Sequence, residues 1–330
     1  MKLLPFPHHA HTAIQELINT QRCVIIIDKN ITKCYHIPFD RENLLILPQG
    51  ECAKSFTTVK KILKKITRSQ FDRSCSLIGI GGGALCDTVG FTASIYMRGI
   101  SAVYVPTTLL AQIDAAYGGK TAINFMGIKN LVGTFHNPHK IISDSAFIES
   151  QNTREYYSGL GEVLKYAIGF DSELFSTVKN NYESIIQRDT HVLDTIITTC
   201  TSIKDSIVKH DMYDAHVRKK LNLGHTFGHA YEQAIHLSHG HAVALGIVAS
   251  SILSKNMGIL PANDFFEIIN CMKLYGFNTS LPRLTKKMKT LLIHDKKILN
   301  KTIDFIIIEK IGKTDIINLE LTKVLELVYG

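Results

Sequence analysis

Short apolar runs that end at polar or glycine residues alternate with helical patterns in the first half of the chain. Continuous runs of β-branched and aliphatic residues are typical of parallel strands that are buried on both faces. We therefore predict an α/β domain of the Rossmann type over residues 1–150, with a parallel sheet and helices between its strands. The predicted strands are residues 23–28, 42–48, 76–80, 101–105 and 140–144.

Two helical patterns follow predicted strands. The stretch 84–97 comes directly after Gly81-Gly82-Gly83, which end the strand 76–80. Strand, glycine turn and helix form an arrangement that binds phosphate groups, because backbone N–H groups reach an anion at the helix N-terminus. The spacing of these glycines differs from G-x-G-x-x-G. The other pattern places on one helix face the apolar residues Phe56, Val59, Ile62, Leu63 and Ile66.

The second half of the chain has a different pattern. Long helical patterns run from about residue 153 to residue 254, and the apolar runs 305–309 and 316–321 precede a closing amphipathic helix. This change predicts a domain boundary near residues 147–153. We expect a mainly α-helical second domain over residues 151–330.

Composition narrows the class of protein. The 330 residues are enough for two cores, and 45% hydrophobic with 20% charged residues is ordinary for a globular protein. The net charge of +8 comes from dispersed Lys and Arg, which favours a small polyanionic substrate over nucleic acid. Seven cysteines without a C-x-x-C pair indicate a reducing compartment, and no apolar run is long enough to span a membrane. We expect a cytoplasmic protein.

Histidines are concentrated in residues 221–245. His225 and His229 are four residues apart, so a helix places them on one face, where they can meet a metal ion or a phosphate. Gly224 and Gly228 beside them would let another backbone approach closely. A helix that is merely rich in histidine is the alternative. The five histidines of this stretch are His225, His229, His236, His239 and His241.

Other polar residues lie where strands or glycine loops end. Gly118-Gly119-Lys120-Thr121 resembles part of a P-loop, but Asp114 occupies the position of the first glycine, so that hypothesis fails. Lys120 and Lys129 remain as two lysines in glycine-containing loops, suited to phosphate or carboxylate. Glu162 and Lys165 are one helical turn apart and form either a surface pair or part of a cleft.

Five motifs in order resemble one family. GGGALCDTVGF, VPTTLLAQIDAAYGGKTAIN, GIKNLVGTF, GLGEVLKYA and LNLGHTFGHA are similar to 3-dehydroquinate synthase of the shikimate pathway, a sugar-phosphate cyclase, and the likeness covers roughly residues 23–310. The resemblance implies an NAD-binding Rossmann-like domain, a helical domain with a divalent metal (zinc or cobalt), an active site between them, and a homodimer. The implied substrate is 3-deoxy-D-arabino-heptulosonate 7-phosphate. The family oxidises its carbon-5 hydroxyl with NAD, eliminates phosphate, reduces the ketone and closes the ring by an aldol step.

The resemblance also implies roles for individual residues. As metal ligands it implies Glu162, His225 and His239. As catalytic residues it implies Asp114, Lys120, Lys165, Arg218, Asn222 and His229. As further substrate-binding residues it implies Lys129, Asn130, Lys204 and Lys296, with Lys297 as the alternative to Lys296. For NAD it implies Asp28, Asn30, Glu51, Lys54, Gly82, Gly83, Asp87, Thr107 and Thr108, with Lys120 and Lys129 near both ligands.

The chain departs from the family pattern at one position, and several other functions are alternatives. The family usually has H-G-E where this chain has His239-Gly240-His241. We hypothesise that His241 lies behind the ligands and changes the metal affinity or its pH dependence; a tolerated replacement is the alternative. The rival functions are another sugar-phosphate cyclase, a metal-dependent polyol dehydrogenase that would release NADH, and a catalytically inactive homologue that serves as a scaffold.

Overall fold

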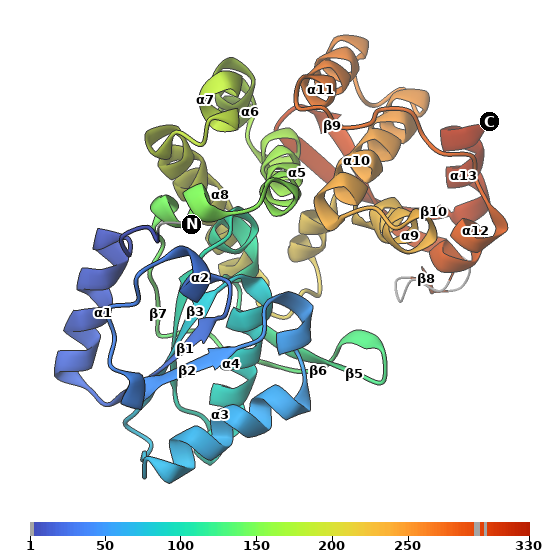
Figure 1. Ribbon diagram of the computed structural model, residues 1–330. Helices are drawn as coiled ribbons and strands as arrows, with labels where there is room; N and C mark the ends of the chain where they lie inside the picture. Colours follow the sequence, from blue (N-terminus) through green and yellow to red (C-terminus); the bar gives the residue numbers. More distant parts are fainter. Residues whose placement is uncertain (1–2, 294–297, 300–301) are drawn as a thin grey trace. The chain divides into compact units, whose positions relative to one another are not determined.

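The apolar runs of the first half form the strands of one parallel sheet, as predicted. The computed structural model describes residues 3–293, 298–299 and 302–330, and the chain divides into two compact units, Met1–Asn152 and Thr153–Gly330 (Figure 1). The sheet of the first unit has the strand order β2-β1-β3-β4-β7, with every neighbouring pair parallel. Its strands are β1 (Cys23–Asp28), β2 (Leu44–Leu47), β3 (Ser76–Gly81), β4 (Ser101–Pro106) and β7 (Lys140–Ile141).

Alternate residues of each strand face two separate apolar layers. Val24 and Ile26 of β1 belong to a core that includes residues of α3 (Phe56–Arg68) and α4 (Gly83–Ile95). Ile25 and Ile27 belong to the opposite core, together with residues of α1 (His8–Thr20) and α2 (Ile31–Cys34). Helices therefore cover both faces of the sheet, which explains why β1 is apolar at five consecutive positions.

Two segments of this unit differ from the sequence prediction. β7 contains only Lys140–Ile141, because Asp144 accepts a hydrogen bond from the N–H of Ala146 (3.1 Å) and begins a 3₁₀ helix, Ser145–Ser150. The glycine-rich stretch after Gly119 is an antiparallel hairpin of β5 (Lys120–Phe125) and β6 (Ile128–Phe135). We predicted loops there.

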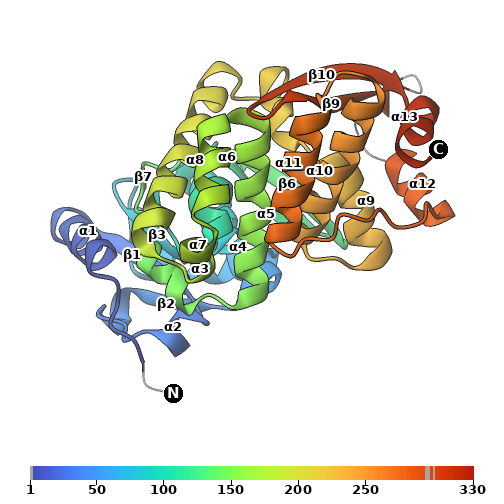
Figure 2. The same ribbon diagram turned by 90° about the horizontal axis from the view of Figure 1, so that it is seen from above.

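The second unit is mainly helical, as predicted, and contains a small antiparallel sheet of order β10-β9-β8. Figure 2 shows its strands β9 and β10. Ser254 of α10 accepts a hydrogen bond from Ile308 of β9, and Thr314 of β10 donates one to Gly169 of α5, so these strands lie beside those two helices. The helices are α5 (Thr153–Phe170), α6 (Ser172–Asn180), α7 (Tyr182–Ile186), α8 (Thr190–His210), α9 (His225–Ile235), α10 (His239–Asn256), α11 (Ala262–Leu274), α12 (Lys286–Ile293) and α13 (Leu321–Tyr329). The strands are β8 (Ile298–Leu299), β9 (Thr302–Lys310) and β10 (Lys313–Glu320). Among the described residues, no helix combines the length and the apolarity needed to cross a membrane.

Candidate cofactor and metal sites

The carboxyl ends of neighbouring strands bring together residues from the predicted NAD set. Thr107, just past β4, donates its N–H to the carbonyl of Gly81 at the end of β3 (3.0 Å). A Cβ added to Gly81 would lie 3.1 Å from the Cβ of Asp28 at the end of β1. Asp28 accepts the N–H of Asn30 (2.7 Å). Ligands of open α/β sheets bind outside this edge, so the position suits a dinucleotide.

The glycine turn of the predicted phosphate site packs closely against its neighbours. Gly82 is the N-cap of α4, and a Cβ on it would lie 3.3 Å from the side chain of Thr108. A Cβ on Gly83 would lie 2.8 Å from Ala115, so the helix N-terminus has no room for a side chain there. The positive end of the helix dipole at this point favours an anion.

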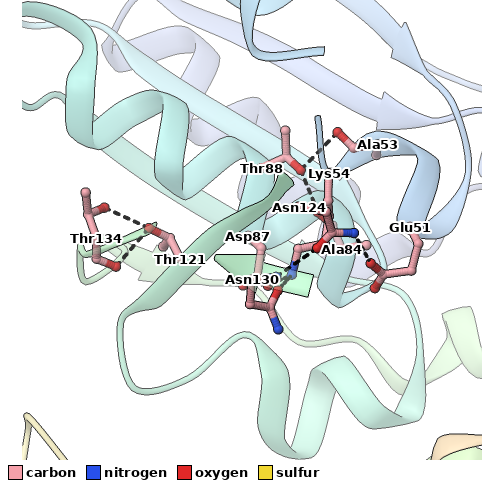
Figure 3. A network of polar contacts seen from close by, with 10 residues as sticks. All are labelled: Glu51, Ala53, Lys54, Ala84, Asp87, Thr88, Thr121, Asn124, Asn130 and Thr134. Atoms are coloured by element: carbon pink, nitrogen blue, oxygen red, sulfur yellow. Dashed lines mark hydrogen bonds and ion pairs between the residues drawn. The ribbon is translucent and has the colours of Figure 1, made fainter. Parts of the chain in front are cut away.

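Lys54 is the centre of a polar network in the first unit (Figure 3). It is 4% exposed, and its ammonium group lies 2.5 Å from the carboxylate of Asp87 and donates to the side-chain oxygen of Asn130. The side chain of Asn124 donates to Glu51 (2.7 Å) and accepts the N–H of Asn130 (2.9 Å). Four residues of the implied NAD and substrate sets are thus joined in one network, and Asn124 belongs to it although we did not predict it.

The remaining implied residues of this unit lie on the hairpin and before it. Lys120 begins β5 and Lys129 lies in β6, and both are exposed. Asp114 is half-buried in a helical turn, Ala111–Ala115. The two lysines are therefore accessible to an anionic ligand.

Three ligand atoms converge in the second unit. Glu162, His225 and His239 form a group whose ligand atoms all lie within 4.8 Å of one another. Nε2 of His225 is 3.3 Å, and Nε2 of His239 is 3.1 Å, from the same oxygen of Glu162. The opposite ring nitrogens also have partners: Nδ1 of His225 contacts the carbonyl of Leu223 (3.1 Å), and Nδ1 of His239 contacts Glu232 (3.2 Å). Imidazoles held at Nδ1 by oxygen and presenting Nε2 are the usual arrangement of metal-binding histidines, so this donor set fits a divalent ion.

Glycine contacts bring these ligands together from three helices. A Cβ on Gly161 would lie 2.4 Å from the carbonyl of Gly240, so α5 and α10 cross with their backbones in contact. The residues next to these two glycines are Glu162 and His239. A Cβ on Gly246 would lie 1.8 Å from the carbonyl of Gly224, which holds the start of α9, and with it His225, against α10. The close approach expected at Gly224 is confirmed.

The electrostatics of the cluster keep its carboxylate ionised. Burial would raise the pKa of Glu162, but Lys165 and the two imidazoles hold that pKa well below its usual range. The ammonium group of Lys165, 1% exposed, lies 2.5 Å from Glu162. Burial lowers the pKa of His225, while for His239 the opposing effects of Glu162 and Glu232 outweigh burial and raise the pKa to about 10. A buried anion surrounded by positive groups is thus already present where a cation would bind.

Other implied residues of the second unit are mostly buried cations. Lys204 on α8 is 7% exposed and Arg218 is 4% exposed. The carboxylate of Asp211, which follows α8, accepts the N–H groups of Ala215 (2.9 Å), His216 (2.6 Å) and Arg218 (3.0 Å). It therefore fixes the loop that carries Arg218. Arg218 lies in a 3₁₀ helix, Val217–Asn222, of which Asn222 is the last residue.

Three histidines of the stretch, His229, His236 and His241, lie outside the ligand group. His229 is exposed, and its ring packs edge-on against that of His225 at 5.4 Å. His241 contacts Ser238 (2.7 Å) and packs against Tyr157 and Phe277. The carboxylate in contact with Nδ1 of His239 is that of Glu232, which we did not predict, although it lies one turn after His229. Lys296 and Lys297 lie outside the described residues.

Comparison with solved structures defines the class of fold. The structure of 2-epi-5-epi-valiolone synthase from Streptomyces hygroscopicus subsp. jinggangensis 5008, with NAD+ and Zn2+ bound, has a TM-score of 0.84 at 24% identity, covering 99% of this chain and 96% of that one. That of 2-deoxy-scyllo-inosose synthase with carbaglucose-6-phosphate, NAD+ and Co2+ has a TM-score of 0.81 at 23% identity, covering 98% and 95%. The fold is that of the dehydroquinate synthase-like sugar-phosphate cyclases, as predicted.

Sequence comparison then defines the family. Residues 44–158 match the family model described as 3-dehydroquinate synthase N-terminal, and residues 159–298 match the one described as 3-dehydroquinate synthase C-terminal. A 3-dehydroquinate synthase of Thermodesulfovibrio yellowstonii is 40% identical over 279 residues, which cover 83% of this chain and 77% of that protein. The chain belongs to the 3-dehydroquinate synthase family, and the family resemblance found in the sequence is confirmed.

Proposed function

We propose that this protein is a 3-dehydroquinate synthase that converts 3-deoxy-D-arabino-heptulosonate 7-phosphate to 3-dehydroquinate and phosphate. The observation that carries the proposal is the convergence of Glu162, His225 and His239 in a chain of this family. These residue types suit a catalytic metal site, because three protein ligands leave a position for substrate oxygens.

We assign the metal site to Glu162, His225 and His239. One carboxylate and two imidazoles suit zinc or cobalt, the ions named in the two solved structures of the same fold. A divalent ion held there would supply Lewis-acid chemistry toward a substrate hydroxyl. Glu232 and the carbonyl of Leu223 keep the two imidazoles in the tautomer that presents Nε2.

The NAD site would lie at the carboxyl edge of the parallel sheet. Gly82 and Gly83 form the N-terminus of α4, where backbone N–H groups can bind the pyrophosphate, and Asp28 at the end of β1 can accept from a ribose hydroxyl. NAD bound there would supply reversible hydride transfer for the proposed oxidation and reduction at carbon 5. The side chains of Glu51, Lys54, Asp87, Thr107 and Thr108 complete the proposed site.

The substrate carries a carboxylate and a phosphate, and each unit by itself holds groups of the kind that bind such anions. Lys120, Lys129 and Asn130 are exposed on the hairpin of the first unit. In the second unit Lys165, Lys204 and Arg218 are buried cations, with Asn222 nearby in sequence. We assign His229, exposed beside the ligand group, to proton transfer, and Asp114 to a supporting role around the substrate.

The decisive experiment measures phosphate release from the heptulosonate phosphate. Purified protein is assayed with NAD, after chelation, and after zinc or cobalt is restored, while absorbance monitors NADH. We expect release that requires both NAD and metal, with no net NADH. Net NADH would instead indicate a polyol dehydrogenase, and release only from another sugar phosphate would indicate a different cyclase. No reaction with any substrate would favour a scaffold.

Cellular location and assembly belong to the same proposal. All seven cysteines are free thiols, which suits the reducing cytoplasm. We propose a homodimer, which the family resemblance implies. Light scattering on the purified protein would measure its mass directly, and a monomeric mass would contradict the dimer.

A further inference from the structure

Asn124 makes three hydrogen bonds, and each goes to a residue of the proposed NAD and substrate sites (Figure 3). Its backbone N–H donates to the carbonyl of Lys54 (3.0 Å). Its side-chain amide donates to Glu51 (2.7 Å), and its side-chain oxygen accepts the N–H of Asn130 (2.9 Å). Asn130 in turn accepts from the ammonium group of Lys54. Asn124, Asn130 and Lys54 therefore form a closed ring.

The backbone around Asn124 explains why this residue can hydrogen-bond to residues outside the hairpin. The pairing of β5 with β6 shifts register between Ile123 and Phe125, so the Asn124 N–H points to Lys54 instead of to β6. Asn130 has a left-handed backbone with φ of 55°. Asparagine adopts this conformation more readily than most residues, and the bond from its N–H to Asn124 holds it there.

The chemistry of the contacts requires an asparagine. Glu51 needs a donor and the N–H of Asn130 needs an acceptor, and both are supplied by one short side chain. Aspartate would keep the acceptor but would place a second carboxylate against Glu51. Alanine would remove both contacts. An amide turned the other way would oppose oxygen to carboxylate and N–H to N–H, so the orientation is defined by the network.

We propose that Asn124 is a positioning residue that links the NAD site to the substrate-binding hairpin. It holds Glu51 and the backbone of Lys54 on one side and Asn130 on the other, so that the binding of NAD and the binding of substrate reinforce each other through it. This inference rests on the proposed function. Asn124 itself is assigned no contact with either ligand.

The test is a double-mutant cycle on NAD affinity, measured by calorimetry with full-length protein. We expect N124A and N124D to raise the Kd for NAD about tenfold, since each removes the hydrogen bond to a charged carboxylate. The KM for substrate should rise as well. In an E51Q background, the amide introduced at position 51 can donate to the carboxylate that N124D introduces, so N124D should cost much less than in wild-type protein. The exposed Asn43 in the same unit supplies the matched control, N43A, with an unchanged Kd.

Each outcome decides the matter. Unchanged NAD affinity in N124A and N124D overturns the inference, and so does an equal cost of N124D in both backgrounds. The rescue in the E51Q background would not follow from general damage to the hairpin, so it supports a positioning role even if N124A folds poorly. Wild-type protein that binds no NAD overturns the proposed function together with this inference.

Discussion

Two buried charges of opposite sign organise the two candidate sites. Lys54, 4% exposed, is the centre of the network in the first unit, and Glu162, completely buried, is the centre of the cluster in the second. A buried charge must be paired or hydrogen-bonded. Lys54 satisfies this with Asp87 and the amide of Asn130, whereas Glu162 is surrounded by Lys165 and two imidazoles. The first arrangement closes on itself, and the second brings together three atoms that could hold a metal ion.

The two sites also differ in what fixes them. Glu162, His225 and His239 come from helices that touch backbone to backbone at glycines. The Lys54 network joins a 3₁₀ helix, a hairpin and one turn of α4 through side-chain hydrogen bonds. We therefore expect substitutions at one centre to abolish metal binding without affecting NAD, and substitutions at the other to do the reverse.

The largest effect is expected from Glu162→Gln. The amide cannot serve as an anionic ligand and leaves the buried Lys165 without its carboxylate. Bound metal measured by elemental mass spectrometry should fall to background, and kcat/KM by more than about 100-fold, the upper range for residues behind a metal ligand. The Kd for NAD should not change.

The matched control for that substitution is Glu267→Gln in the same unit. Glu267 pairs with Lys179 at the surface, where both side chains are nearly half exposed. Surface pairs contribute roughly 0–1 kcal/mol, so metal content and rate should match wild type. Full metal occupancy in Glu162→Gln would refute the ligand assignment.

Glu232→Gln should come next in size. The substitution removes the charge in contact with Nδ1 of His239 and keeps the shape of the side chain. We expect zinc affinity, titrated against a competing chelator, to fall about 10- to 100-fold, as is typical for such partners. His241→Glu serves as the comparison, because it restores the usual family residue. A changed zinc affinity in this variant would show that His241 shares the role of Glu232 in supporting the proposed ligands. An unchanged affinity in Glu232→Gln would assign the contact to packing alone.

Lys54→Met tests the other centre. Methionine keeps the apolar stem but leaves Asp87 and Asn130 without the charged donor, and such bonds contribute about 1.5–3 kcal/mol. The Kd for NAD should rise roughly tenfold or somewhat more, with metal content unchanged. Lys60→Met, on the exposed face of α3, is the control. Loss of metal in Lys54→Met would contradict the separation of the two sites.

The elements with strong apolar runs were predictable from the sequence, and the contacts between distant residues were not. β1 was predicted with its observed ends, since both of its faces are buried and no polar residue interrupts it. The hairpin of β5 and β6 was missed, because most of β6 is exposed and glycines at 118, 119, 127 and 133 obscure the alternation.

The candidate site residues likewise divide into those that the sequence pattern could predict and those that it could not. The spacing of His225 and His229 favoured a pair, but the atoms that converge with His225 belong to Glu162 and His239, which only the glycine contacts between helices bring near. The family resemblance supplied that set; the residue pattern could not. Asn124 depends on a register shift and Glu232 on the turn between α9 and α10, and neither leaves a periodic signal in the sequence.

The smallest effect is expected from Asp211→Asn, which concerns a buried carboxylate held by neither a metal cluster nor a lysine. Burial would raise the pKa of Asp211, but the three backbone N–H donors of the following loop lower it to about 2 from 3.8. Because the folded-state pKa is depressed, its stabilising contribution is present above pH 3.8 and is lost as the pH falls through about 2. Asparagine removes the charge, so the unfolding midpoint of the variant should depend less on pH over this acidic range.

The loop between Asp211 and Arg218 would loosen in the same variant. The KM for substrate should rise about threefold, within the effect of one lost hydrogen bond, while NAD and metal binding stay unchanged. Asp205→Asn, which removes an exposed pair with Lys209 on the same helix, is the control, and an acid profile of Asp211→Asn equal to that of wild type would show that this carboxylate does not support the loop in solution.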